Sequence, residues 1–289
     1  MNEEKSKTMT PNKVIFVLVD ALGYDVATRH FGFLEHLAES GQGAKYRLRG
    51  QLPSLSRPMY ETLLTGLPVW RHGVTDNGVC RRSRFPSLFR LTKEAGLTNA
   101  VAGWGWLLEL YGDRPLPFDL DRDRLCLEGS GDIMHGIFYV ADEYPDSHLY
   151  ADGDTLRQLY HPDFLMIHPM GVDNSGHKYG ALSKEYAAAA GDSGAQIARH
   201  FEAWRRDGYQ LVVTGDHGMD ALGRHEGNEP IQREVPLYIV SDRAQCGDFS
   251  GEEPLTTLDV APLLCRLLGI DPAEGMKRDS AIHMKEERP

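Results

Sequence analysis

Three short apolar runs of the sequence are each followed by residues that can bind metal ions. In an open parallel sheet, ligands bind beyond the carboxyl ends of the strands, so these residues are the first candidates for a site. They comprise three carboxylates and three imidazoles: Asp20, Asp173, His177, Asp216, His217 and His225. Mixed nitrogen and oxygen ligands suit two divalent cations, with Zn²⁺ as first choice and Mn²⁺ as second.

Each of these residues, taken alone, also has a structural interpretation. A single aspartate after a strand, such as Asp20, more often caps a helix or starts a turn. The four-residue spacing of Asp173 and His177 places both on one face of a helical turn, although polar loops produce this spacing by chance. The pair Asp216 and His217, directly after a Val-rich run, is the strongest single indication.

A candidate nucleophile lies in the segment LPSLSRPMYETLLTG, which contains Ser54 and Ser56. A hydroxyl at the start of the following helix would lie where amide groups and the helix dipole favour an anion. Ser56 can equally be a simple N-cap before Pro58. Spacing alone does not decide between these two roles.

The elements that must position these residues follow from apolar periodicity. Short β-branched runs alternate with helical stretches, which is typical of a parallel sheet covered by helices on both faces. We predict strands at 14–19, 99–103, 163–168, 210–214 and 235–240. We predict helices at 31–39, 59–64, 87–95, 186–206 and 257–268.

The fold class expected from this pattern is α/β, with a mostly parallel central sheet, in a single compact domain over residues 1–289. Between residues 104 and 160 the periodicity weakens. This segment is either a lid or substrate-facing insertion, or an ordinary long excursion with its own small core.

Composition limits the class of partner. The chain has 289 residues, 41% of them hydrophobic, and a net charge of −11 from 42 acidic and 31 basic residues. This balance argues against a surface for duplex nucleic acid, because phosphate backbones are held by clustered cations. Small substrates or metal cations fit better, and the oligomeric state is left open.

The compartment is inferred from cysteines and from the N-terminal residues. The four cysteines are far apart and form no CxxC pair, which favours a reducing compartment and excludes zinc-finger chemistry. The first apolar run, 14–19, is too short for a signal sequence or a membrane span. We therefore predict a cytoplasmic protein with no membrane partner.

With these positions assembled, the chain resembles the alkaline phosphatase superfamily, in particular its type I phosphodiesterase/nucleotide pyrophosphatase branch. The resemblance runs from about residue 14 to residue 270. It is carried by the order and spacing of VLVDALGYD, SLSRPMYETLLTGLPVWRHGVTDN, VDNSGH, TGDHGMDALGRHEG, REVPLYIV and DVAPLLCRLLGI. An alkaline-phosphatase-like fold is therefore expected.

The resemblance implies two metal sites. One cation would be held by Asp20, Ser56, Asp216 and His217. The other would be held by Asp173, His177 and His225. His168 matches no ligand position, and we expect it to be structural or to lie around the ligands.

The resemblance also implies the catalytic roles. Ser56 is chosen over Ser54 because the family nucleophile stands two residues before a proline and nine before a Thr-Gly pair, as Pro58 and Thr65 do here. Asn77 matches the asparagine that hydrogen-bonds the phosphoryl oxygens in this branch. Sulfatases of the superfamily need an arginine four positions after the nucleophile, and Tyr60 stands there instead, so sulfatase activity is disfavoured.

The expected function is hydrolysis of phosphodiester or pyrophosphate bonds, dependent on two metals, through a phosphoseryl intermediate. Alternatives with the same architecture are a phosphonate hydrolase, a phosphomonoesterase and a phosphotransferase. An alternative of another class is a metal-binding module without catalysis. Arg57, beside the nucleophile, is expected either to touch a substrate anion or to be a solvated loop cation.

Overall fold

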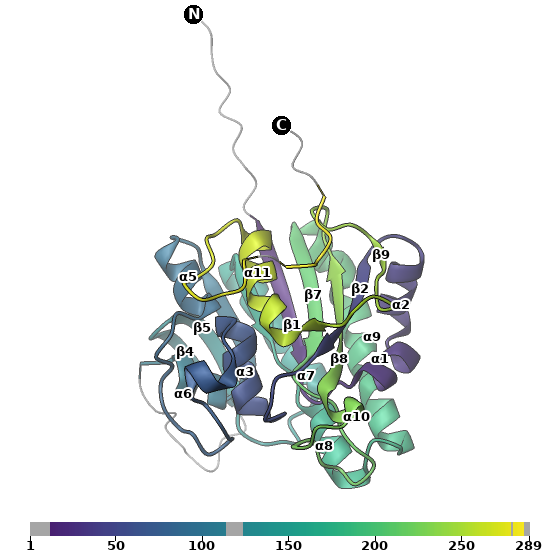
Figure 1. Ribbon diagram of the computed structural model, residues 1–289. Helices are drawn as coiled ribbons and strands as arrows, with labels where there is room; N and C mark the ends of the chain where they lie inside the picture. The colour runs from purple at the N-terminus through teal and green to yellow at the C-terminus, as the bar shows by residue number, and fades with distance from the viewer. Residues whose placement is uncertain (1–11, 114–123, 279, 286–289) are drawn as a thin grey trace, which may run out of the picture.

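The computed structural model describes residues 12–113, 124–278 and 280–285. Within these ranges, ten strands form one sheet, in the order β10-β2-β8-β7-β1-β6-β3-β5-β4 with β9 beside β2 (Figure 1). The strands are β1 (Lys13–Val19), β2 (Ala44–Arg49), β3 (Asn99–Trp104), β4 (Arg124–Ser130), β5 (Ile133–Tyr139), β6 (Phe164–Ile167), β7 (Tyr209–Gly215), β8 (Glu234–Val240), β9 (Gly247–Asp248) and β10 (Leu255–Thr256).

The central part of the sheet is parallel. Strand β1 pairs in parallel with β6 and β7, and β3 pairs in parallel with β5 and β6. Strand β8 runs antiparallel to both β2 and β7, and β4 runs antiparallel to β5. The predicted α/β class with a mostly parallel sheet is confirmed, with antiparallel pairs towards both edges.

Helices cover both faces of this sheet, and Figure 1 shows α3 and α11 in front of it. The helices are α1 (Tyr24–His30), α2 (Gly32–Glu39), α3 (Ser56–Thr65), α4 (Val69–His72), α5 (Leu88–Glu94), α6 (Trp106–Tyr111), α7 (Asp146–Tyr160), α8 (Gly171–Tyr179), α9 (Lys184–Arg206), α10 (Pro230–Arg233) and α11 (Val260–Leu268). A 3₁₀ turn, Thr257–Asp259, precedes α11.

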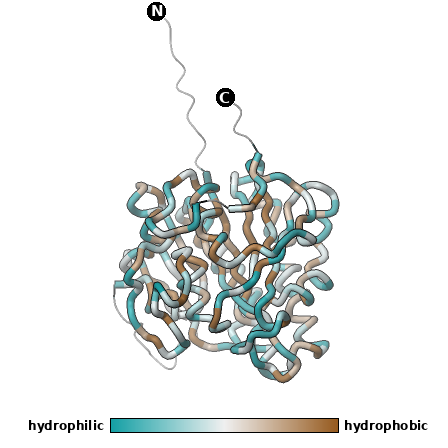
Figure 2. The backbone as a smooth tube through the Cα atoms, in the orientation of Figure 1, coloured by the Kyte–Doolittle hydropathy of each residue, from teal (hydrophilic) through white to brown (hydrophobic). Residues whose placement is uncertain are grey.

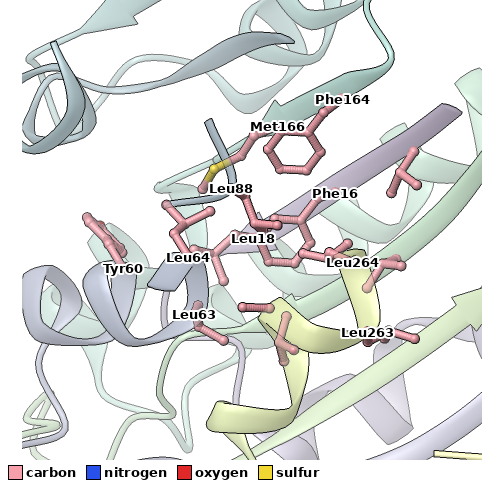
Figure 3. Packing of buried hydrophobic residues seen from close by; sticks show 14 of the residues in the cluster. Phe16, Leu18, Tyr60, Leu63, Leu64, Leu88, Phe164, Met166, Leu263 and Leu264 are labelled. Atoms are coloured by element: carbon pink, nitrogen blue, oxygen red, sulfur yellow. The ribbon is translucent and has the colours of Figure 1, made fainter. Parts of the chain in front are cut away.

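Two apolar cores lie on opposite faces of the sheet, because successive strand residues point to opposite sides. From β1, Phe16 and Leu18 pack with Leu63 of α3 and Leu264 of α11 (Figure 3). The alternate residues of β1 join the second core, with α1, α2, α7 and α9. Figure 2 shows the hydrophobic strands enclosed by more polar helices and loops. Each buried large apolar side chain contributes about 1.5–3 kcal/mol.

Residues 104–160 contribute to the sheet itself. Strand β5 extends the parallel sheet beyond β3, β4 pairs with β5, and α7 packs against the sheet and α9. Residues 114–123 of this segment lie outside the described residues. The lid or substrate-facing role stays a prediction. Among the described helices, none is long and apolar enough to cross a membrane.

Candidate metal centre

The candidate residues meet at one end of the sheet. Asp20 directly follows β1 and Asp216 directly follows β7, and these neighbouring strands are parallel, so both side chains lie at their carboxyl ends. Asp173 and His177 come from helix α8, which follows β6 on the other side of β1. Helix α8 lies below the sheet in Figure 1. Parallel pairing therefore brings together residues that are far apart in the sequence.

A first cluster surrounds the ring of His217. Its Nε2 atom lies 3.1 Å from Ser56 Oγ, 3.4 Å from Asp20 Oδ1 and 3.3 Å from Asp216 Oδ2. All four side chains are buried. These are the four residues that the resemblance assigns to one cation, and they can offer their ligand atoms to a common point.

A second cluster adjoins the first. Ligand atoms of Asp173, His217 and His225 lie within 4.8 Å of one another. His177 Nε2 is 3.4 Å from Asp173 Oδ1, and the rings of His217 and His225 stack with centroids 3.9 Å apart. The three residues predicted for the second cation thus lie together, and His217 stands between the two clusters.

The ring orientations of the three histidines fit metal ligation. Each Nδ1 atom faces a backbone carbonyl: Gly223 O at 2.8 Å for His177, Gly218 O at 3.0 Å for His217 and Ser54 O at 2.9 Å for His225. Such a bond fixes the tautomer with the proton on Nδ1 and leaves the Nε2 lone pair for a metal.

The carboxylates fit as well. Three buried carboxylate oxygens of the candidate ligands have no hydrogen-bond partner among the described residues, namely Asp20 Oδ1, Asp173 Oδ1 and Asp216 Oδ2. Buried polar atoms are nearly always paired, and a divalent cation would satisfy these three. The residues present therefore fit a pair of divalent cations.

The electrostatics of the site point in the same direction. Burial, with the charges of Asp216 and Asp173, raises the pKa of Asp20 well above its usual range. Burial also raises the pKa of Asp173 to about 7. The pKa values of His217 and His225 are lowered to about 4 by burial, so both imidazoles are neutral, as ligation requires. Such buried carboxylates need a positive charge nearby to ionise.

Ser56 and Ser54 have different surroundings. Ser56 is the first residue of α3, after the N-cap residue Leu55, and its hydroxyl contacts His217 Nε2. It therefore does not cap the helix. Ser54 Oγ instead donates to the backbone carbonyl of Gln232 at 2.9 Å. The choice of Ser56 over Ser54 agrees with this geometry.

Asn77 lies against the start of the same helix. Its Oδ1 accepts a hydrogen bond of 3.0 Å from the backbone N–H of Arg57, the residue next to Ser56. This bond uses the amide oxygen of Asn77, so its amide nitrogen is the group that can donate to a ligand.

Arg57 has neither of its two expected roles. Its side chain is buried, pairs with Glu109 Oε2 at 2.6 Å and lies over the ring of Trp106, 4.5 Å from the ring centroid. It ties the start of α3 to α6 and is neither a solvated loop cation nor a group open to substrate. The sequence next to Ser56 does not indicate that Arg57 is buried, because its partner Glu109 lies on another helix and is brought close only by folding.

Two further residues contact Asp20: Tyr60, for which no role was predicted, and His168, which was expected to be structural or to lie around the ligands. The hydroxyl of Tyr60 donates to Asp20 Oδ2 at 2.5 Å, one turn of helix after Ser56. The His168 ring lies 3.5 Å from the same oxygen, measured from Nε2. The helical spacing of Ser56 and Tyr60 is the one signal that could have placed Tyr60 at the site.

The comparisons with known proteins identify the family of the chain. Residues 14–125 and 131–241 match the family model described as type I phosphodiesterase / nucleotide pyrophosphatase. The chain is similar to the catalytic subunit of GPI ethanolamine phosphate transferase 3 of Mus musculus, with 27% identity over 287 residues that cover 90% of this chain. It spans only 24% of that relative's length, and 35% of the length of GPI ethanolamine phosphate transferase 2 of Aspergillus fumigatus.

Solved structures share the fold. Murine ectonucleotide pyrophosphatase / phosphodiesterase 5 has a TM-score of 0.65 at 14% identity, covering 90% of this chain and 96% of that one. The phosphonate monoester hydrolase of Silicibacter pomeroyi has a TM-score of 0.64 at 14% identity, covering 93% and 75%. At such identities the likeness concerns the fold alone, whereas the family model spans most of the sequence. The chain belongs to the type I phosphodiesterase / nucleotide pyrophosphatase family.

Proposed function

We propose that this chain is a two-metal-dependent hydrolase that cleaves phosphodiester or pyrophosphate bonds through a phosphoseryl intermediate on Ser56. One observation carries the proposal. Ser56 Oγ, at the first residue of α3, lies 3.1 Å from His217 Nε2, which in turn lies within 3.4 Å of Asp20 and Asp216. A hydroxyl in such a cluster is suited to act as an alkoxide nucleophile.

The residues of the chain would divide the work as follows. Divalent cations, when bound, lower the pKa of a hydroxyl and neutralise charge that develops on phosphoryl oxygens. Ser56 Oγ forms a bond to phosphorus as the bond to the leaving oxygen breaks. The amide of Asn77 donates to a non-bridging oxygen. Water then cleaves the phosphoseryl bond and frees Ser56. We expect Zn²⁺ first and Mn²⁺ second, because the donors are nitrogen and oxygen.

A second candidate is transfer of the phosphoryl group to an alcohol. Curated relatives carry the name GPI ethanolamine phosphate transferase, which favours this candidate. Both reactions share the attack by Ser56 and differ only in whether water or an alcohol takes the group from it.

The test compares substrates and acceptors on one preparation. The protein, loaded with Zn²⁺ or Mn²⁺, is assayed with bis-p-nitrophenyl phosphate, p-nitrophenyl phosphate, a phosphonate monoester and phosphonoacetate. We expect the diester to be cleaved fastest. A preference for the monoester by about 100-fold, a difference of roughly 2.7 kcal/mol in the barrier, would overturn the diesterase assignment.

The acceptor is identified in the same assay by adding a primary alcohol such as ethanolamine. Hydrolysis converts bis-p-nitrophenyl phosphate into p-nitrophenol and p-nitrophenyl phosphate. Transfer converts it into p-nitrophenol and a new mixed diester of the added alcohol. Predominance of the mixed diester at millimolar alcohol would replace hydrolysis by phosphotransfer.

A further inference from the structure

The two oxygens of Asp20 have different surroundings. Oδ1 faces the first cluster, 3.4 Å from His217 Nε2, and has no hydrogen-bond partner among the described residues. Oδ2 accepts the hydroxyl of Tyr60 at 2.5 Å and has His168 Nε2 at 3.5 Å. One oxygen is therefore directed towards the candidate cation, and the other is enclosed by two side chains.

His168 is held in place by its backbone. Its N–H donates to Ala102 O at 2.9 Å, and its carbonyl accepts the hydroxyl of Tyr139 at 2.8 Å. Its ring meets the ring of Tyr60 edge to face, with centroids 4.6 Å apart. The side chain is fully buried. The backbone bonds and the packing against Tyr60 thus hold the imidazole beside Asp20 Oδ2.

Neither ring nitrogen of His168 has a hydrogen-bond partner in the part of the chain that the structure describes. A buried imidazole without partners lowers stability compared with an apolar side chain of similar size. An unpartnered buried polar group calls for an explanation, and a role of its polar atoms in another state of the protein is one. The surroundings of its neighbour Asp20 would differ in the cation-loaded state, in which Oδ1, unpartnered among the described residues, would contact the ion.

We propose that His168 is a positioning residue for the metal centre: together with Tyr60 it holds Asp20 Oδ2 by hydrogen bonding, so that Oδ1 is presented to the cation. This rests on the metal centre of the proposed function. A neutral imidazole has one N–H to give, and Nε2 is the nitrogen on the side of Oδ2. We do not assign direct ligation to His168, since its Nε2 faces Oδ2, the oxygen that already accepts the hydroxyl of Tyr60, whereas Oδ1 is the oxygen that faces His217.

The test measures cation affinity and metal-free stability in the same set of variants. Zn²⁺ is titrated into chelator-treated protein against a chromophoric chelator, for wild type, H168L, H168Q and Y60F. We expect H168L and Y60F to lower the affinity for one of the two cations, the one that Asp20 would hold, by about 10- to 100-fold. H168Q keeps an N–H donor and should recover most of that loss. The double variant Y60F/H168L should lose less than the product of the two single losses, because both residues act on one oxygen.

Stability without metal separates positioning from packing. Removing an unpartnered imidazole should leave the thermal midpoint of metal-free H168L equal to or above that of wild type. His72 provides the matched control, since this buried histidine is bonded to Thr62 Oγ1 and to the N–H of Val74, away from the centre. H72L should lower the midpoint and leave Zn²⁺ affinity unchanged.

Three results would overturn the proposal. If H168L binds two Zn²⁺ ions as tightly as wild type, His168 does not position Asp20, and the metal centre stands. If metal-free H168L loses as much stability as H72L, the role of His168 is packing. If wild-type protein binds no Zn²⁺ at all, both this proposal and the proposed function fail.

Discussion

In the carboxylates of Asp20 and Asp216, one oxygen accepts hydrogen bonds and the other has no hydrogen-bond partner among the described residues. Asp216 Oδ1 accepts the N–H groups of Ala21 and His217, both at 2.9 Å, while its Oδ2 has no partner among the described residues. Asp20 repeats this division through Tyr60. One oxygen of each carboxylate is therefore fixed by the protein, which orients the other for a cation.

The role of Asn77 can be tested at this scale. Its Oδ1 is occupied by the N–H of Arg57, so only its amide N–H groups can reach a substrate. We expect N77A to lower kcat/KM for a diester by about 100-fold, as the loss of one preorganised donor does. Cation affinity should not change, since Asn77 is not a ligand. Wild-type kcat/KM in N77A would remove Asn77 from the catalytic residues.

Pairs of elements are tied together by buried charges near the centre. Arg57 of α3 and Glu109 of α6 form an ion pair in which the side chains are 1% and 11% exposed. Asp146, the first residue of α7, accepts the N–H of Gly171 at the start of α8 at 3.0 Å. The first contact fixes the helix of Ser56, and the second fixes the helix of Asp173 and His177.

The ion pair between α3 and α6 should matter for stability. Removing Glu109 leaves the Arg57 guanidinium buried without its counter-ion, and we expect E109A to lower the free energy of unfolding by about 3 kcal/mol. Urea denaturation followed by circular dichroism measures this. Replacing both members, in R57M/E109M, should cost less than E109A alone, because no unpaired charge remains. An E109A protein as stable as wild type would mean that Arg57 finds another partner.

The contact between α7 and α8 should make stability depend on pH. Burial raises the pKa of Asp146 from 3.8 to about 7. The folded state thus binds this proton more tightly than the unfolded state, so the contribution of Asp146 is present below pH 4 and is lost as the pH rises to about 7. The variant D146N keeps an acceptor for Gly171 without the charge.

We therefore expect the stability of D146N relative to wild type to improve between about pH 5 and about pH 8. Urea denaturation of chelator-treated protein at the two pH values measures the difference without a contribution from bound metal. A difference that stays constant between these pH values would show that Asp146 does not titrate in this range.

At the scale of the whole molecule, five strands could be predicted because their residues are apolar on both faces, whereas β5, which pairs in parallel with β3, lies in the segment 104–160 where the periodicity weakens. All five predicted strands are present, and so is the position of Asp173 and His177 on a helix. Strand β2 was missed because its sequence AKYRLR contains three basic residues. One of them, Lys45, is buried with Glu35 as its partner at 2.7 Å, a contact that depends on tertiary structure.

Some residues of the site could also be predicted from the sequence, whereas some of its contacts could not. Asp20, Asp216 and His217 could be found because they directly follow strand runs, and Ser56 because its spacing resembles that of a known family. The contacts of Tyr60 and His168 with Asp20 could not be predicted, since they are defined only by distances in the folded chain. Strand alternation predicts which residues reach the edge of a sheet, but not which of them touch.

The central claim is that two cations and Ser56 act together in cleaving a phosphodiester. The most direct measurement adds Zn²⁺ stepwise to chelator-treated protein and follows bound metal and turnover of bis-p-nitrophenyl phosphate in the same samples.

The control S193A removes a buried hydroxyl that contacts Tyr150 OH at 3.0 Å, remote from the centre. We expect turnover to rise until two Zn²⁺ ions are bound per chain, in wild type and in S193A alike. S56A should still bind Zn²⁺ yet lose turnover by roughly 1,000-fold or more. Full turnover by metal-free protein, or wild-type turnover by S56A, would contradict the claim.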